Sequence, residues 1–211
     1  MPISSPAEYN TIITMLGALC ATVQAATGIY AAYIKKKLSQ LKRNDVLFRS
    51  HRAFGGFATT LYLLGLFAGI TGFLDAITKQ EVVPFEIDDL SFNFHTWPSF
   101  LIMIIILYKT FLSYFNKRKM YQQAKWLGMA TFIAWAYTWI TAAISYYVRT
   151  VPPNLQHDTP KFLLPYDLYG LQILLPFIIG GLISIPILIK ANKLAKKEDI
   201  KKKKRTESQA E

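Results

Sequence analysis

Apolar residues gather in five long stretches that are separated by short polar segments. Each stretch can cross a hydrocarbon core of ~30 Å as a helix that rises ~1.5 Å per residue. A soluble chain of 211 residues has no use for five such segments. The pattern therefore predicts an all-α polytopic membrane protein with five transmembrane helices, at residues 9–34, 51–77, 94–115, 126–148 and 165–189.

The connections between these stretches are short, so we expect one transmembrane domain over residues 1–190. The lysine-rich residues 191–211 are predicted to form a disordered cytoplasmic tail, because they contain too little apolar surface to fold. Residues 35–50 and 116–125 are expected to be loops on one side of the membrane. Residues 78–93 and 149–164 are expected to be loops on the other side.

Basic residues favour one orientation. With the N-terminus outside and the C-terminus inside, only Lys79, Arg149 and Lys161 of the 24 lysines and arginines remain outside. This is the distribution that the positive-inside rule predicts for a plasma-membrane protein. Lys109 lies near the inner end of the third helix, and its long side chain can reach the inner interface.

The net charge of +11 is concentrated on one face of the membrane and needs no nucleic acid to explain it. The expected partners are the lipid bilayer and either other membrane subunits or further copies of the chain. The basic tail either touches anionic headgroups or is simply solvated. A single cysteine, Cys20, excludes an intrachain disulfide or an iron–sulfur motif.

The second helix carries small residues on one face. A spacing of three and four residues relates His51, Gly55, Ala58, Tyr62, Gly65, Gly69 and Gly72. Gly65 and Gly69 form a GxxxG pair, which lets another helix or a flat ligand approach the backbone closely. Trp135 and Trp139 lie one turn apart in the fourth helix. Like the glycine face, they have two interpretations: they pack tightly against other helices, or they form a wall beside a planar cofactor.

Histidines are the candidate metal ligands, since neutral imidazole can bind haem iron or another metal. His51 and His95 lie at opposite ends of the second and third helices, roughly 25–30 Å apart, and cannot bind the same iron. Met129 lies at the depth of His51, while His157 with Asp158 could complete a metal site at His95. Each histidine is equally interpretable as a polar residue at the membrane interface.

Three segments together resemble the core of small membrane b-type cytochromes. They read HRAFGGFATTLYLLGLFAGITGF, NFHTWPSFLIMIIILYKTFLSYF and KWLGMATFIAWAYTWITAAISYY, and they cover roughly residues 45–150. The resemblance implies a haem b site with His51 as an iron ligand and Arg52 paired with a propionate, and it matches His95 to the family's second histidine, which would bind a separate metal. It also implies that Gly55, Gly65, Gly69 and Gly72 line the surface that admits the ring.

The sequence departs from that family at the start of the later helix. Such proteins generally carry a further histidine there, whereas this chain reads MYQQAKWLGM. Met129 or Lys125 could replace it, a partner subunit could supply it, or the site could be lost.

Three functions follow as hypotheses. The first is a haem-binding electron-transfer subunit or an assembly factor of a redox complex. The second is a non-enzymatic structural membrane protein that packs through its glycine face without a cofactor. The third is a small-solute transporter. It is the weakest hypothesis, because the helices carry little charge and show no internal repeat. No nucleophile–base pair, P-loop or HExxH motif is present, so no catalytic residues are predicted.

Overall fold

The computed structural model describes residues 6–34, 45–78, 90–149 and 162–207. Within them lie five long helices, each long and apolar enough to span a membrane. They are α1 (Pro6–Tyr33), α2 (Val46–Thr78), α3 (Leu90–Phe115), α4 (Lys117–Arg149) and α5 (Tyr169–Glu207), with a 3₁₀ turn η2 (Tyr166–Leu168) before the last. The predicted all-α architecture with five candidate spans is confirmed.

Several helices are longer than the apolar stretches that predicted them. α2 begins at Val46 because the Asp45 carboxylate accepts hydrogen bonds from the backbone N–H groups of Leu47 and Phe48, at 2.8 and 3.4 Å. Asn116 similarly accepts the N–H of Lys119 at 3.0 Å. Both are the side-chain caps with which helices ordinarily begin.

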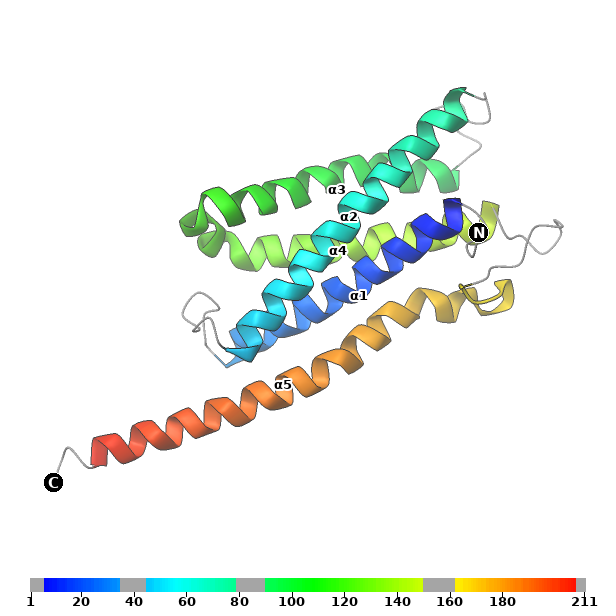
Figure 1. Ribbon diagram of the computed structural model, residues 1–211. Coiled ribbons are helices and arrows are strands. Elements are labelled where there is room, and N and C mark those ends of the chain that lie inside the picture. The colour runs from blue at the N-terminus through cyan, green and yellow to red at the C-terminus, as the bar shows by residue number, and fades with distance from the viewer. Residues whose placement is uncertain (1–5, 35–44, 79–89, 150–161, 208–211) are drawn as a thin grey trace.

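Two predicted boundaries therefore change. The segment 116–125, expected to be a loop, is helical from Lys117, so α3 and α4 form a hairpin joined at Asn116. Residues 191–211 were expected to form a disordered tail, but helix α5 continues through this segment to Glu207. Pro176 and Pro186 lie inside α5, whose ribbon is visibly not straight (Figure 1).

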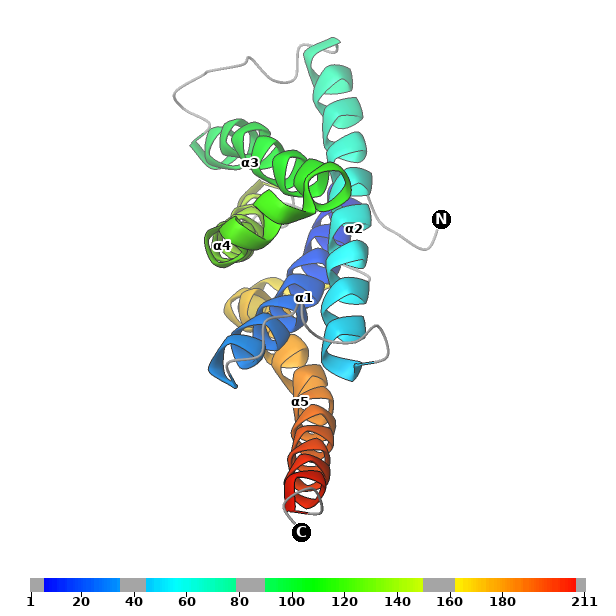
Figure 2. The ribbon, with the colours of Figure 1, turned by 90° about the vertical axis from the view of Figure 1, so that its left-hand side faces the viewer.

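α1 is the centre of the bundle. It packs against α2, α4 and α5, while α3 lies on α4 on the side away from α5 (Figure 2). α2 crosses the bundle obliquely, and its last turns project away from α1 (Figure 1).

Glycines bring α1 close to its neighbours. A Cβ at Gly17 would overlap the ring of Trp135 on α4. A Cβ at Gly180 on α5 would lie 2.9 Å from the backbone oxygen of Leu19 and 2.8 Å from Cβ of Thr22. Small residues at helix contacts are the usual means of close packing inside a membrane.

The core surrounds the two tryptophans of α4. Trp135 is buried and meets Tyr62 of α2 edge to face, with ring centroids 5.6 Å apart. Trp139 is fully buried, and its Nε1 donates a hydrogen bond to the backbone oxygen of Ile173 at 2.8 Å. Of the two roles considered for these rings, the contacts in the structure are those of packing.

Candidate functional site

Two sites built around a histidine lie near opposite ends of the bundle. The first, the His51 cluster, consists of Gln24 and Thr27 on α1, His51 on α2 and Lys109 on α3. His51 Nδ1 lies 3.0 Å from the backbone oxygen of Gln24 and 3.2 Å from Oγ1 of Thr27. A carbonyl oxygen only accepts, so Nδ1 carries the proton, and in the neutral ring Nε2 keeps its lone pair.

Two glycines make room for this cluster. A Cβ at Gly28 would lie 3.3 Å from Cε1 of His51, and a Cβ at Gly55 would overlap the side-chain amide of Gln24. α1 and α2 therefore exchange polar side chains, each of which lies over a glycine of the other helix. The close contact is what brings His51 within hydrogen-bonding distance of the α1 backbone.

Lys109 completes the cluster from α3. Its Nζ donates to Oε1 of Gln24 at 3.4 Å, so the amine is directed toward α1. The sequence had instead suggested that the side chain extends to the inner interface at the end of its own helix. Tyr108, its neighbour, donates to Oε1 of Gln123 at 3.3 Å, which places this turn of α3 beside the polar beginning of α4. The cluster thus lies near one membrane interface. An ionisable group at that depth is a functional candidate.

The candidate metal ligands His51 and His95 lie apart, as their places at opposite helix ends predicted. His51 lies against α1, whereas His95 lies against α4 near the other end of the bundle. Met129 is 46% exposed on α4. Arg52, the expected propionate partner, is exposed and has its guanidinium 5.6 Å from the centre of the Phe48 ring.

The glycine face that was expected to admit a haem is used in two different ways. Gly55 faces Gln24, and a Cβ at Gly65 would meet Asn10 and Ile13 of α1 at 3.4 and 3.5 Å. Gly69 and Gly72 have nothing within 4 Å of their Cβ positions. Since Gly55 and Gly65 are covered by side chains of α1, a haem ring does not fit directly against these two glycines.

The second site, the His95 pocket, lies where α1 begins and α4 ends. His95 Nδ1 is 3.1 Å from Oγ1 of Thr141, and that hydroxyl donates to the backbone oxygen of Tyr137 at 2.8 Å. Thr141 therefore accepts from Nδ1–H, and the lone pair of the neutral ring is again on Nε2. His157 and Asp158, predicted as co-ligands of a metal, fall outside the described residues. The described residues contain no group of three histidine, cysteine, aspartate or glutamate side chains that could bind a metal ion.

A cavity of about 310 Å³ adjoins His95. It is bounded by three helices and is lined by Ala7, Asn10, Thr11, His95, Ala142, Ser145 and Tyr146. None of these described lining residues carries a charged side chain. The sequence pattern did not reveal this pocket, because its polar residues come from three helices and are unremarkable in each.

Polar side chains near the His95 pocket form hydrogen bonds to the backbone of residues 162–164, which precede α5. The carboxylate of Glu8 is fully buried and accepts the N–H of Phe162 at 3.0 Å. Gln172 accepts the N–H of Leu164 at 3.0 Å, and Tyr147 donates to the backbone oxygen of Leu164 at 2.7 Å. Residues from α1, α4 and α5 thus bind one short stretch of backbone.

The chain matches no family model, and no curated protein or solved structure shows a significant similarity to it. The fold and the two sites therefore define a class only. The protein is a multi-pass membrane protein of all-α architecture, with five candidate transmembrane helices in the described part of the chain.

Proposed function

We propose that the protein is a non-enzymatic integral membrane protein whose bundle is held by glycine contacts around α1. It acts by presenting this bundle to partner membrane subunits or to further copies of itself. The observation that carries the proposal is that Gly55 and Gly65, expected to line a cofactor, are filled by Gln24, Asn10 and Ile13 of α1.

Matched leucine substitutions on α2 test this proposal. Gly65→Leu should destabilise the protein by about 1–3 kcal/mol, because the added side chain overpacks the contact with α1. Gly69→Leu should leave stability nearly unchanged, because nothing lies within 4 Å of that position. Unfolding in mixed detergent micelles measures both. Equal effects of the two substitutions would contradict the proposed packing.

The partner-binding role is tested separately. His51→Ala should leave the bundle folded and should leave co-purification with membrane partners unchanged, since it removes the hydrogen bond to Gln24 but keeps the glycine contacts of α2 at Gly55 and Gly65. Loss of function in His51→Ala without loss of fold would instead point to chemistry at the imidazole.

Haem-dependent electron transfer is the second candidate, and one observation favours it. His51 donates from Nδ1 and keeps its lone pair on Nε2, which is the arrangement that an iron-binding imidazole uses. Haem would supply one-electron chemistry. If it binds, the purified protein should show a Soret band with sharp α and β bands on reduction, and His51→Ala should abolish them. A flat visible spectrum after expression with added haem would eliminate this candidate.

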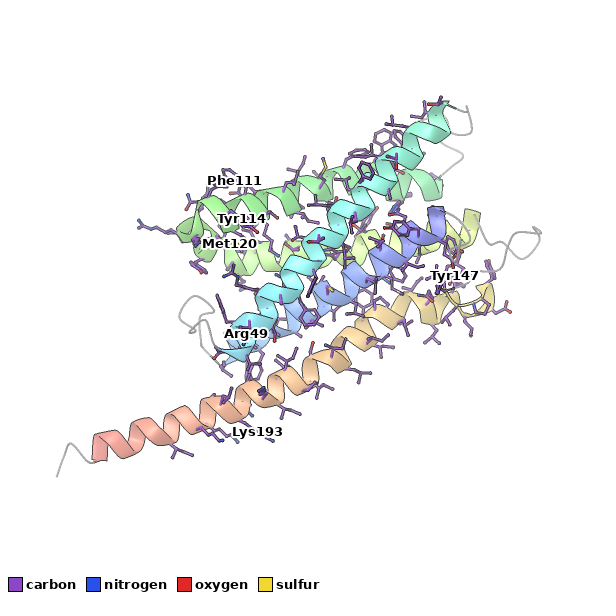
Figure 3. All side chains as sticks on the ribbon, viewed as in Figure 1. Arg49, Phe111, Tyr114, Met120, Tyr147 and Lys193 are labelled. Carbon is purple, nitrogen blue, oxygen red and sulfur yellow. The ribbon has the colours of Figure 1, made fainter. Side chains whose placement is uncertain are left out.

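We further propose that the protein lies in the plasma membrane with its N-terminus outside. The distribution of basic residues supports this, because Arg49, Lys193 and the α3–α4 connection occupy one end of the bundle, opposite Tyr147 (Figure 3). In a Cys20→Ala background, Ser4→Cys should react with an impermeant maleimide on intact cells. Ser208→Cys should react only after lysis, and the reverse result would invert the topology.

A further inference from the structure

The His95 pocket has hydrogen-bonding groups that the protein itself does not use. Asn10 of α1 and Ser145 of α4 form no side-chain hydrogen bond within the described part of the chain. His95 uses only Nδ1, so Nε2 is an available acceptor. Two donors and one acceptor therefore come to one cavity from three separate helices. Polar groups inside a membrane protein are ordinarily satisfied, so their convergence on a hollow indicates a ligand site.

Within the described part of the chain, the pocket walls offer a charged ligand no side chain of opposite charge. The nearest acid in sequence, Glu8, is buried and directed to the backbone of Phe162 instead of the cavity. A charged group would lose its hydration there without gaining a partner of opposite charge. At about 310 Å³, the cavity is at the lower end of small-ligand pockets, which span about 300–1,000 Å³. A single neutral ring is the kind of head group that fits.

The position of the pocket favours a ligand that dissolves in the membrane. A separate, wholly apolar groove of about 400 Å³ follows α3 and α4 from Pro98 and Tyr137 toward the middle of the bundle. On α3 the groove residue Pro98 is three residues from the pocket residue His95, and on α4 Tyr137 is five residues from Ala142. These spacings correspond to about 5 and 8 Å of helical rise. An aliphatic tail is the natural occupant of such a surface.

We infer that the His95 pocket binds the head group of a quinone. The amide of Asn10 and the hydroxyl of Ser145 would donate to the two carbonyl oxygens of the oxidised ring. When the ring is reduced, one of its hydroxyls would donate to Nε2 of His95. Tyr146, Ala142 and Ala7 provide the remaining walls. This inference goes beyond the proposed packing function and stands independently of haem.

Calorimetric titration of the detergent-purified full chain with decylubiquinone and its reduced form tests the site. We expect saturable binding of both forms with one site per chain. Ser145→Ala should weaken binding of the oxidised form about 5–10-fold, the usual effect of one lost hydrogen bond. His95→Phe should weaken binding of the reduced form more than that of the oxidised form.

Two control variants make the result decisive. His51→Phe changes the histidine near the other end of the bundle, and Ser184→Ala removes a hydroxyl that donates to the backbone of Gly180 inside α5. Both should bind the quinone as the unaltered protein does, and gel filtration identifies any variant that fails to fold. Absence of saturable binding would overturn the inference. So would unchanged affinity in folded Ser145→Ala and His95→Phe, or an equal loss in the controls.

Discussion

Replacing Trp139 with alanine is expected to destabilise the protein by about 3–5 kcal/mol, the usual cost of removing a buried large aromatic side chain. Trp139 is fully buried among Ala18, Ala143 and residues of α5. Its indole also donates the 2.8 Å hydrogen bond to Ile173 that joins α4 to α5. Truncation removes both the packing and the bond. Unfolding in mixed detergent micelles, or the temperature at which the purified protein aggregates, measures the loss.

Two further variants separate the contribution of packing from that of the hydrogen bond. Trp126→Ala removes an indole that is 66% exposed and should change stability little. Trp139→Phe keeps a ring but loses the donor, and should cost about 0.5–1.5 kcal/mol. If Trp139→Ala were no more harmful than Trp126→Ala, the core described around α4 would be incorrect.

The second large effect is expected at Gly180 of α5. Gly180→Leu should cost about 1–3 kcal/mol or more, because its Cβ would lie 2.9 Å from the backbone oxygen of Leu19. Backbone cannot rotate aside as a flexible side chain can, so α5 must move away from α1. The neighbouring Gly181 provides a matched control, since nothing lies within 4 Å of its Cβ position.

The readout is the same for both glycines. Gly181→Leu should unfold like the unaltered protein, whereas Gly180→Leu should unfold earlier and should separate α5 from the other helices. Limited proteolysis near η2 would detect that separation as faster cleavage. A similar stability of the two variants would show that α5 does not pack on α1 through Gly180.

The number and type of the helices could be predicted from the sequence because long apolar stretches have few alternative structures. Their ends could not be read from hydropathy. Lys117 and the residues that follow it are polar yet helical, and the caps Asp45 and Asn116 were the available signal. Helical polar turns beyond an apolar span are therefore easily mistaken for loops.

The candidate sites were predictable only in part. The sequence singled out His51 and His95, and the structure places both on polar partners. The sequence could not indicate that Lys109 contacts Gln24, because that contact depends on which helices are neighbours. The same holds for the glycines. Gly65 and Gly69 share one face of α2, but only Gly65 meets α1, because α2 crosses α1 obliquely and leaves it.

The central place of α1 has a consequence for how the protein is made. α1 precedes the other four helices, so it enters the membrane before any of the surfaces that it will contact. Its last major neighbour, α5, emerges only after α2, α3 and α4 have been synthesised. Until then, the surface of α1 around Leu19 that receives Gly180 faces lipid or the insertion machinery. Assembly of the bundle is thus tied to the synthesis of α5, and chains interrupted before α5 should be recognised and degraded by membrane quality control.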